Sequence, residues 1–524
     1  MPLTVRTDVT IPATEVLLAA GGDVRIALDS EGGRNKYGCS IYPDSALIAF
    51  GSSTASVISE HGFAAADRLR DELASGAAIE SSVVSYARRL DAMRMELAAL
   101  CGIADLPGLE IVFAASGTDS HLIAAQLMRQ HGPLCAIMVE EGETGRGVPA
   151  ALAGRHFSTR TALARNVAEG DAIADDETAV VTIAMRLADG SPRAIEAMDA
   201  EVAARVHEAV AAGQRVLLTL VDVSKTGMIM PGTACVSALH RQYHGQVEVL
   251  VDACQFRIAS STLRAYLQQG FMVAVTGSKF ITGPTFSGAL LIPSPVAQRM
   301  QRYAVPSSLR AYSAPADWPG GWDTAKLDAA GANYGLLLRW EAALTELRLF
   351  RAIPERDVGS FLQAFAAAVL QKLGSNPVFE VLPVPELNRA PVSAGTSWDS
   401  LPTIFPFLLY RRRANGACQP LSCDEMTDIY HLLQRDLSAD ARLLADTPNN
   451  QLLASRVQLG QPVRCGVRDG IPVSALRLNV SARLIVEALS PQGTGAAPVI
   501  ARALAALDKV ALLMHMNFGL SRFK

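Results

Sequence analysis

Between about residues 105 and 295, short runs of apolar residues alternate with longer amphipathic stretches. The runs are rich in valine, isoleucine and leucine with little polar alternation, which is typical of strands covered on both faces of a parallel sheet. These runs are 109–114, 134–139, 179–184, 215–221, 247–251, 271–275 and 287–292. Helix-like segments lie between them, at 119–130, 194–212, 236–243 and 260–269. This order predicts a large α/β domain built around a mostly parallel sheet.

The chain is long enough for several domains, and its pattern changes near Pro354. Beyond that residue, helices are interleaved with a few alternating strands, as in a smaller α+β domain. Those strands are expected at 379–383, 403–409 and 475–480, after a long connecting helix over 327–350. We therefore expect an N-terminal segment over 1–100, a large domain over 101–354 and a small domain over 355–524. The N-terminal segment carries helical stretches at 62–74 and 79–100, whose packing surface the sequence does not assign.

Composition excludes several classes of protein. Half of the residues are apolar, so the chain can bury a core and is not intrinsically disordered. It carries 47 basic and 51 acidic residues with no long run of like charge, which argues against nucleic acid as the main partner. The longest uncharged stretch, 280–298, is broken by prolines and glycines, so we expect no membrane association. No uninterrupted hydrophobic leader is visible either, so the expected compartment is the cytoplasm.

The eight cysteines show no spacing that would suit a metal site. Free thiols in a reducing compartment are therefore expected, and no metal is predicted.

Two polar clusters follow candidate strands that are consecutive along the chain. Asp252 and Gln255 follow the run 247–251, and Thr276, Ser278 and Lys279 follow the run 271–275. Open α/β sheets bind their ligands at the carboxyl ends of the strands. A lysine there, between an apolar strand and Phe280, suits an amine that acts as a nucleophile toward an aldehyde.

Pyridoxal 5′-phosphate would give each of these residues a task. An aspartate such as Asp252 can pair with the pyridine nitrogen and keep it protonated, so that the ring accepts electrons. A phosphate group needs hydroxyls and backbone amides at the start of a helix. Ser116, Gly117 and Thr118 supply them between a strand and a helix, and Gly117 allows close approach of the backbone.

These residues resemble the fold type I pyridoxal-phosphate-dependent enzymes, and in particular the class V aminotransferase and cysteine desulfurase branch. The branch's D-x-x-Q motif is matched by Asp252 and Gln255, and its S-x-K motif by Thr276, Ser278 and Lys279. Its G-P-x-x-S-G motif is matched by residues 283–288. The resemblance covers about residues 105–295 well and implies a large domain with a mostly parallel seven-strand sheet plus a small C-terminal α+β domain.

The resemblance also implies residue roles. Lys279 would be the lysine of the internal aldimine, Asp252 the partner of the pyridinium, and Gln255 a donor to the ring 3′ oxygen. Thr276 and Ser278 would contact the phosphate, together with the turn of Ser116, Gly117 and Thr118. Ser224 stands where an asparagine of the branch usually contacts the cofactor.

Two features depart from the branch. Its members stack a histidine or aromatic ring on the pyridine from a strand end near residues 139–145, and that segment contains neither. His156 lies nearby, but we expect an ordinary packed residue there. Cysteine desulfurases also carry a reactive cysteine on a loop of the small domain. Cys418 and Cys423 are placed for that role, yet a helix is predicted to begin beside Cys423 after Ser422, so we interpret both as bystanders.

Two residues are predicted to bind substrate. Arg477 interrupts an apolar strand, and in the similar L-R-x-S stretch of the branch the arginine binds the substrate carboxylate; here Asn479 replaces the serine. The alternative is that Arg477 faces solvent on an edge strand, and Arg464 and Arg468 are weaker candidates for the same role. Tyr37 lies in a polar turn that would border the substrate in this superfamily, although loop structure alone explains such a turn equally well.

The sequence thus predicts an enzyme that acts on an amino acid or related amine, with aminotransfer as the first expectation. The alternatives are a lyase that breaks a C–S or C–C bond, a decarboxylase, or a protein that keeps the fold but only binds. The resemblance further implies a homodimer, because this fold builds its site at the subunit boundary.

Overall fold

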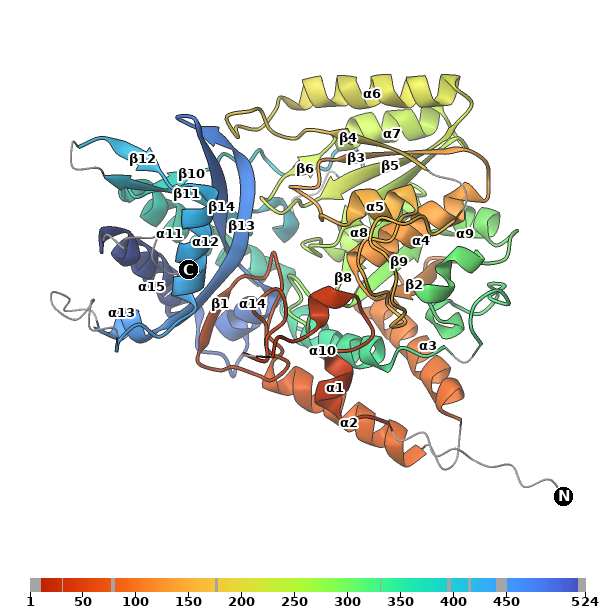
Figure 1. Ribbon diagram of the computed structural model, residues 1–524, viewed down its shortest axis with the longest axis horizontal. Coiled ribbons are helices and arrows are strands. Elements are labelled where there is room, and N and C mark those ends of the chain that lie inside the picture. The colour runs from red at the N-terminus through yellow and green to blue at the C-terminus, as the bar shows by residue number, and fades with distance from the viewer. Residues whose placement is uncertain are drawn as a thin grey trace.

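The computed structural model describes residues 11–30, 32–76, 81–174, 178–329, 331–393, 397–412, 416–439 and 450–516. Figure 1 shows two bodies side by side, each built around one sheet, with the larger body on the right and the smaller on the left. No helix in these described ranges is both long enough and apolar enough to cross a membrane.

The larger sheet follows the strand order β2-β9-β8-β7-β5-β3-β4. All of these strands run in one direction except β9, which is antiparallel to β2 and β8. Their bounds are β2 (Glu110–Ala114), β3 (Leu134–Val139), β4 (Ala179–Ile183), β5 (Arg215–Asp222), β7 (Val247–Ala253), β8 (Met272–Thr276) and β9 (Gly288–Ile292). A two-residue strand, β6 (Ile229–Met230), also pairs with β5. The predicted mostly parallel seven-strand sheet is confirmed.

Helices cover both faces of this sheet because its strands are apolar on both sides. In β3, Leu134, Ala136 and Met138 pack into one core, while Cys135 and Ile137 pack into the other. The helices around the sheet are α4 (Gly117–Arg129), α5 (Val148–Ala153), α6 (Ile195–Ala211), α7 (Thr233–Gln242), α8 (Ser260–Gln268) and α9 (Ser294–Met300). Helices α4, α5 and α9 lie over one face, and α6, α7 and α8 lie over the other. This layering leaves the carboxyl ends of the parallel strands open to a ligand.

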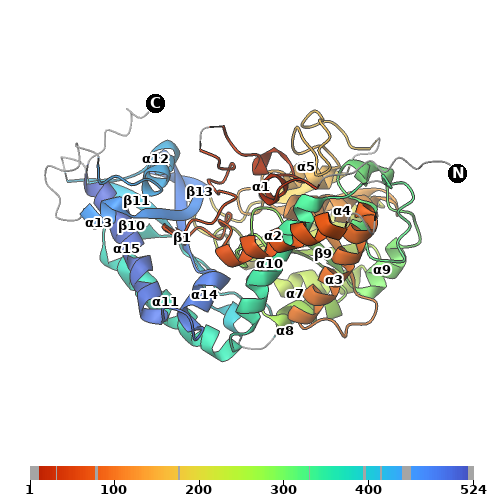
Figure 2. The same cartoon turned by 90° about the horizontal axis from the view of Figure 1, so that it is seen from below.

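The N-terminal part of the chain packs across the junction of the two bodies. Its elements are α1 (Thr14–Leu18), the 3-10 helix η1 (Val24–Ile26), β1 (Leu47–Phe50), α2 (Glu60–Gly76) and α3 (Ser82–Leu100). Helices α2 and α3 match the predicted stretches, apart from residues 79 and 80, which lie outside the described ranges. Both pack against α10 (Tyr334–Arg351), as Figure 2 shows from below. The surface that the sequence left unassigned is therefore α10.

The predicted connecting helix over 327–350 begins later than expected, at Tyr334. Asn333 caps it, because its side-chain oxygen accepts a hydrogen bond from Leu336 N at 2.9 Å. The helix ends at Arg351, and α11 (Glu355–Ser375) begins directly after Pro354. Between α9 and α10 the chain forms two 3-10 helices, η2 (Ser307–Ala311) and η3 (Pro315–Asp317).

The smaller sheet has the order β1-β13-β14-β11-β10, with β12 also paired to β11. Its strands are β10 (Phe379–Val381), β11 (Ile404–Arg412), β12 (Cys418–Pro420), β13 (Arg456–Arg468) and β14 (Ile471–Asn479), in addition to β1. The remaining elements are η4 (Trp398–Ser400), α12 (Cys423–Leu433), α13 (Asn450–Ala454), α14 (Ala482–Leu489) and α15 (Ala496–His515). Strand β1 runs parallel to β13, so a strand from the N-terminal segment belongs to this sheet.

Arg257, in the loop after β7, ties the two bodies together. Its guanidinium is buried and donates to Val480 O at 2.7 Å, to Thr403 O at 3.3 Å and to Ser52 Oγ at 2.9 Å. It therefore fixes the end of β7 to the smaller sheet and to the segment after β1.

Candidate active site

A cavity of about 300 Å³ opens where the carboxyl ends of β5, β7 and β8 face the smaller sheet. Its lining comes from the N-terminal segment, from loops of the larger sheet and from β13 and β14. Such a site between two bodies of an α/β protein is a common place for a cofactor or substrate.

Asp252 and Lys279 line this same cavity. Strands β7 and β8 are neighbours, and Asp252 lies opposite Ala274 in the pairing. Lys279 is half-buried in the turn three residues beyond the end of β8. The adjacency of two parallel strands thus brings the carboxylate and the amine together across a long stretch of sequence.

The carboxylate of Asp252 is held in its ionised form. Its Oδ1 accepts a hydrogen bond from Cys254 N at 3.1 Å, and its Oδ2 lies 3.4 Å from His121 Nε2, an ion-pair contact. Burial acts to raise the pKa of Asp252, but His121 and Lys279 outweigh it and hold the pKa well below its usual value.

His121, in the first turns of α4, is a site residue that the sequence analysis missed. Its Nδ1 lies 2.7 Å from Gly117 O, and because a carbonyl can only accept, Nδ1 carries a proton. Burial lowers the pKa of His121, but the charge of Asp252 opposite raises it above its ordinary value overall. The only sequence signal was its place four residues after Gly117, one turn along the same helix.

The amino end of α4 forms a second wall of the cavity, lined by Ser116, Gly117 and Thr118. Ser116 is the N-cap, and its oxygen accepts a hydrogen bond from Asp119 N at 3.3 Å. A Cβ at Gly117 would lie 2.5 Å from Cys254 Sγ, so the turn can approach β7 only with glycine there. Thr118 Oγ1 accepts a hydrogen bond from Arg25 at 3.4 Å. The helix end, the Arg25 cation and the Thr118 hydroxyl together suit an anionic group, whereas the Ser116 hydroxyl donates to Asp119.

Other residues predicted to hold the cofactor also line the cavity. Thr276 Oγ1 donates to Cys254 O at 2.6 Å, and Ser278 is buried beside Lys279. The side-chain nitrogen of Gln255 donates to Ser53 O at 2.9 Å, which uses one of its two hydrogens.

Both residues predicted to bind substrate line the cavity too. Arg477 lies on β14, between β13 and β11, so it is not on an edge strand, and it is only 1% exposed. Its guanidinium donates to Lys225 O and to Thr54 Oγ1, both at 3.0 Å. Burial lowers the pKa of Arg477 to about 10, with Glu143 acting against that shift.

Tyr37 packs edge to face against Phe286 with ring centroids 6.2 Å apart, and burial raises the pKa of its phenol. The two weaker alternatives to Arg477 lie outside the lining. Arg464 is exposed, and Arg468 pairs with Glu380 at 3.1 Å.

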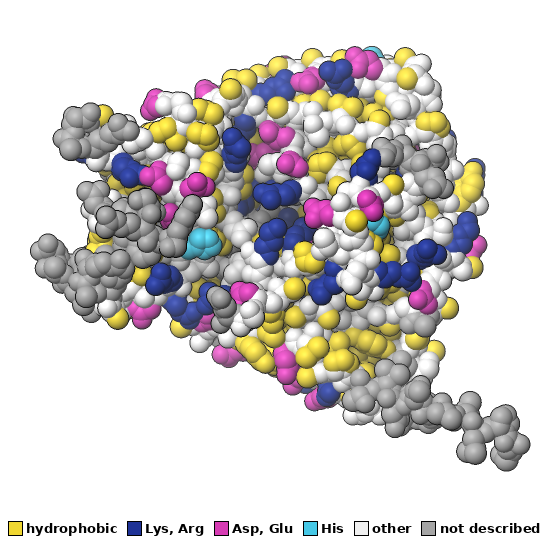
Figure 3. All heavy atoms as spheres, in the orientation of Figure 1, with side chains coloured by type: hydrophobic (Ala, Val, Ile, Leu, Met, Phe, Trp, Pro, Cys, Tyr) yellow, Lys and Arg dark blue, Asp and Glu magenta, His cyan; other side chains and the backbone are white. Residues whose placement is uncertain are grey.

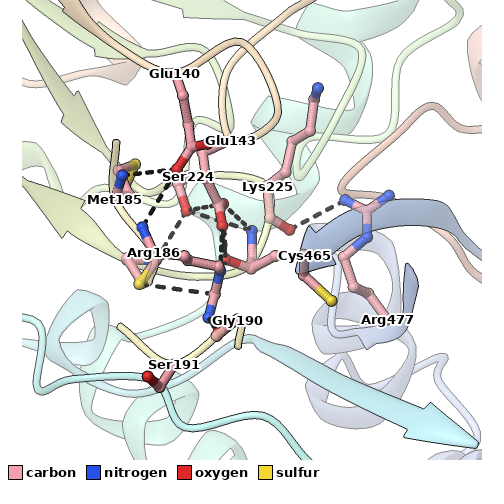
Figure 4. A network of polar contacts seen from close by, with 12 residues as sticks. Glu140, Glu143, Met185, Arg186, Gly190, Ser191, Ser224, Lys225, Cys465 and Arg477 are labelled. Carbon is pink, nitrogen blue, oxygen red and sulfur yellow. Dashed lines mark hydrogen bonds and ion pairs between the residues drawn. The ribbon is translucent and has the colours of Figure 1, made fainter. Parts of the chain in front are cut away.

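Ser224 does not line the cavity, although the sequence predicted a cofactor contact there. Its hydroxyl donates to Glu143 Oε2 at 2.8 Å, in the network that Figure 4 shows. Glu143 also accepts from Thr226 Oγ1 at 2.7 Å and from Arg186 Nε at 2.8 Å. Burial acts to raise the pKa of Glu143, but Arg186 and the hydrogen bonds hold it below its ordinary value.

Glu143 lies in the segment where the sequence lacked the expected histidine or aromatic ring, and it lines the cavity. Nothing in the sequence linked it to Arg186, because the two residues follow different strands, β3 and β4. His156 lies outside the lining: its Nδ1 is 2.5 Å from Tyr312 Oη and the two rings stack. Cys418 lies on β12 and Cys423 begins α12, and neither lines the cavity.

Asp119 makes the stability of the folded protein depend on pH. Burial raises the pKa of its carboxyl to about 7, although the hydroxyl of Ser116 donates to it at 2.5 Å. The pKa in the unfolded chain is about 4. The folded state therefore binds this proton more tightly, so its contribution to stability is complete below about pH 4 and is lost as pH rises through about 7.

In the cofactor-free protein, we expect the Asp119→Asn variant not to show this fall in stability as pH rises. Between pH 4.5 and pH 7.5, the free energy of unfolding of the wild type should fall by about 2–4 kcal/mol more than that of the variant. Thermal unfolding followed across that range measures the difference, with the exposed Asp71→Asn as control. Parallel pH profiles for wild type and Asp119→Asn would contradict the assignment.

Comparison with solved structures shows the fold of the chain. The cysteine desulfurase CsdA of Escherichia coli aligns with a TM-score of 0.52 at 15% identity, over 89% of this chain and 95% of its own. A NifS-like protein aligns with a TM-score of 0.52 at 13% identity, over 89% of this chain and 99% of its own. A structure described as SPT with PLP gives a TM-score of 0.50 at 12% identity, over 89% of this chain and 88% of its own.

No protein-family model and no curated protein matches the sequence. The structural likenesses confirm the predicted fold class, which is the fold type I architecture.

Proposed function

We propose that this protein is a pyridoxal-phosphate-dependent enzyme that acts on an amino acid or related amine through Lys279. The observation that carries the proposal is one cavity lined by three groups: an amine, a carboxylate held ionised by a buried histidine, and the amino end of α4. These groups correspond to the aldehyde, the ring nitrogen and the phosphate of the cofactor.

The residues present fit the cofactor in detail. The backbone amides of the turn at 116–118, with Thr118, Arg25 and Ser278, would hold the phosphate at the start of α4, while the Ser116 hydroxyl is committed to Asp119. Gln255 keeps one N–H for the ring 3′ oxygen, since the other bonds to Ser53 O. Ser224 is committed to Glu143, so we assign it to positioning the turn at 224–226 instead of to the cofactor.

When bound, the cofactor supplies a conjugated ring that accepts electrons from the substrate α-carbon. Asp252, kept ionised by His121, holds a proton at the ring nitrogen. Arg477 binds the substrate carboxylate with the guanidinium hydrogens that its bonds to Lys225 O, Thr54 Oγ1 and Gln461 O leave free. The amine of Lys279 carries the proton to or from the α-carbon as a general acid or base.

Aminotransfer is the reaction that we propose first. A desulfurase that passes sulfur to its own cysteine needs a thiolate that reaches the substrate. The thiol in the lining is that of Cys254, which is buried, and burial and Asp252 raise its pKa well above the ordinary value. Elimination at a C–S or C–C bond and decarboxylation are the other outcomes that the test below separates. We also propose a homodimer, from the resemblance, which light scattering on the purified protein tests.

The test is spectroscopic and uses the wild-type protein. We expect a visible absorbance band after incubation with pyridoxal phosphate, which borohydride removes, leaving the cofactor covalently attached to the peptide that carries Lys279. An amino donor should then bleach the band, and a keto acid should restore it. Release of pyruvate, sulfide or carbon dioxide without an acceptor would instead assign a lyase or decarboxylase. A protein that stays colourless with the cofactor would contradict the whole proposal.

A further inference from the structure

The cavity has far more positive than negative charge in its lining. Figure 3 shows lysine and arginine side chains gathered around a hollow near the middle of this face. Two acidic side chains line the cavity, Glu143 and Asp252. Six basic side chains line it, namely Arg25, Lys36, Arg146, Lys225, Lys279 and Arg477.

The two acids do not balance this charge, because each is engaged by a cation that is not among those six. Glu143 pairs with Arg186 at 2.8 Å, and Asp252 pairs with His121 at 3.4 Å. Of the basic groups, Arg25 has its own acidic partner, Asp23, at 2.6 Å. The cavity therefore keeps a surplus of cations that favours anionic ligands.

The cofactor and an ordinary amino acid would use only part of this surplus. In the proposed function, Lys279 holds the cofactor, Arg25 and α4 face its phosphate, and Arg477 takes the substrate α-carboxylate. Lys225 has no task in that scheme, although its side chain lines the same cavity.

The backbone of Lys225 is held in place by hydrogen bonds. Its backbone N donates to Glu143 O at 2.8 Å, and its O accepts from Arg477 at 3.0 Å. Its neighbours Ser224 and Thr226 both bond to Glu143. Figure 4 shows the Lys225 side chain extending away from this network, while the Arg477 guanidinium contacts the backbone O of Lys225 and Arg186 points into the network. The Nζ donates an exposed hydrogen bond of 3.1 Å to Glu141 O.

The surroundings of Lys225 also indicate a group prepared for an anion. The pKa of Lys225 is lowered to about 8, first by burial and then by the charges of Arg477 and Lys279, which outweigh the opposite effect of Glu143 and Glu141. A negative ligand group beside these three cations would relieve their mutual repulsion.

We propose that the substrate is an amino compound with a second anionic group, a carboxylate or a phosphate, and that Lys225 recognises this group. The inference rests on the proposed function and names the substrate class of that same site. Arg477 then binds the α-carboxylate, and the neighbouring Lys225 discriminates acidic from neutral side chains.

Calorimetric titration of the cofactor-loaded protein with pairs of amino acids, one acidic and one neutral in each pair, tests this inference. The pairs are L-glutamate with L-glutamine, L-aspartate with L-asparagine, and O-phospho-L-serine with L-serine. We expect the acidic member of at least one pair to bind about 10-fold or more tightly than its neutral partner. Preference for phosphoserine or for the dicarboxylic amino acids identifies which anionic group is recognised.

The Lys225→Met variant should weaken binding of the acidic ligand about 10-fold or more while leaving the neutral ligand unchanged. Lys326→Met, at an exposed lysine outside the cavity, is the matched control and should change neither. The visible band of each variant reports whether the site has kept its cofactor. If the band is present, two results would overturn the inference. One is equal affinity for the acidic and the neutral ligand in all three pairs, and the other is a Lys225→Met variant that binds both ligands of a pair more weakly by the same factor. A wild type without the band would overturn the proposed function and this inference with it.

Discussion

Replacing Lys279 by alanine is expected to lower kcat by at least about 10⁴-fold. The substitution removes both the amine that would hold the cofactor and the group that would move the proton at the α-carbon, and general acid–base catalysis alone contributes about 10²–10⁴. Lys279 is half-buried in a turn, so the fold should survive. The variant should also bind pyridoxal phosphate reversibly and give no cofactor adduct after borohydride.

Rescue by small amines separates this role from a structural one. If the missing group is the amine, millimolar methylamine or ethylamine should restore part of the activity of Lys279→Ala, because the shortened side chain leaves room beside the reacting atoms. The exposed Lys326→Ala should behave as wild type with and without the amine. Wild-type turnover in Lys279→Ala would rule out the catalytic assignment.

Replacing Arg389 by methionine is expected to destabilise the protein by about 3–5 kcal/mol, because it leaves a buried carboxylate without its cation. Arg389 contacts both oxygens of Asp222, at 2.6 and 2.7 Å, and both side chains are almost fully buried. Burial acts to lower the pKa of Arg389, but Asp222 raises it above its ordinary value overall. Asp222 ends β5, so this pair fixes the segment before η4 to the sheet edge that carries the site.

Two further variants identify the buried charge as the cause. Arg389→Met combined with Asp222→Asn should be more stable than Arg389→Met alone, since only one of the two buried carboxylates near Arg389, that of Asp399 at 3.9 Å, then keeps an unpaired charge. Arg356→Met, at a highly exposed arginine paired with Asp357, should change stability little. Urea unfolding measures all of them, provided that the slope of the transition stays constant. A single variant as stable as wild type would show that the pair contributes nothing.

The larger sheet could be predicted because most of its strands are buried on both faces and therefore consist mainly of apolar residues; the end strand β4, exposed at two of its five positions, is the exception. Strand β3 is buried at every position. Strand β13 was missed because glycines and a proline interrupt it. Its register also shifts between Gly460 and Val463 and again between Arg464 and Gly466, which destroys the alternation of polar and apolar residues. Strand β1 is four residues long and pairs with a strand some 400 residues away, so no local pattern reveals it.

The site also combines features that a local sequence pattern reveals with features that depend on distant parts of the chain. Asp252 and Lys279 could be placed together because they follow successive strands that turned out to be neighbours. The links from His121 to Asp252 and from Arg186 to Glu143 depend on how separate loops fold back over the sheet. The hydrogen bond from the Ser224 hydroxyl to Glu143 joins two separate loops in the same way, so the sequence could not set it against the predicted cofactor contact.

The pairing of β1 with β13 means that the smaller body is not one continuous piece of chain. A fragment beginning at residue 355 would lack β1, and the 13-residue strand β13 would become an unprotected edge. Bare edges recruit strands from other molecules. Attempts to produce the two halves separately should therefore yield an aggregating C-terminal half, and co-expression of both pieces is the route to a reassembled protein.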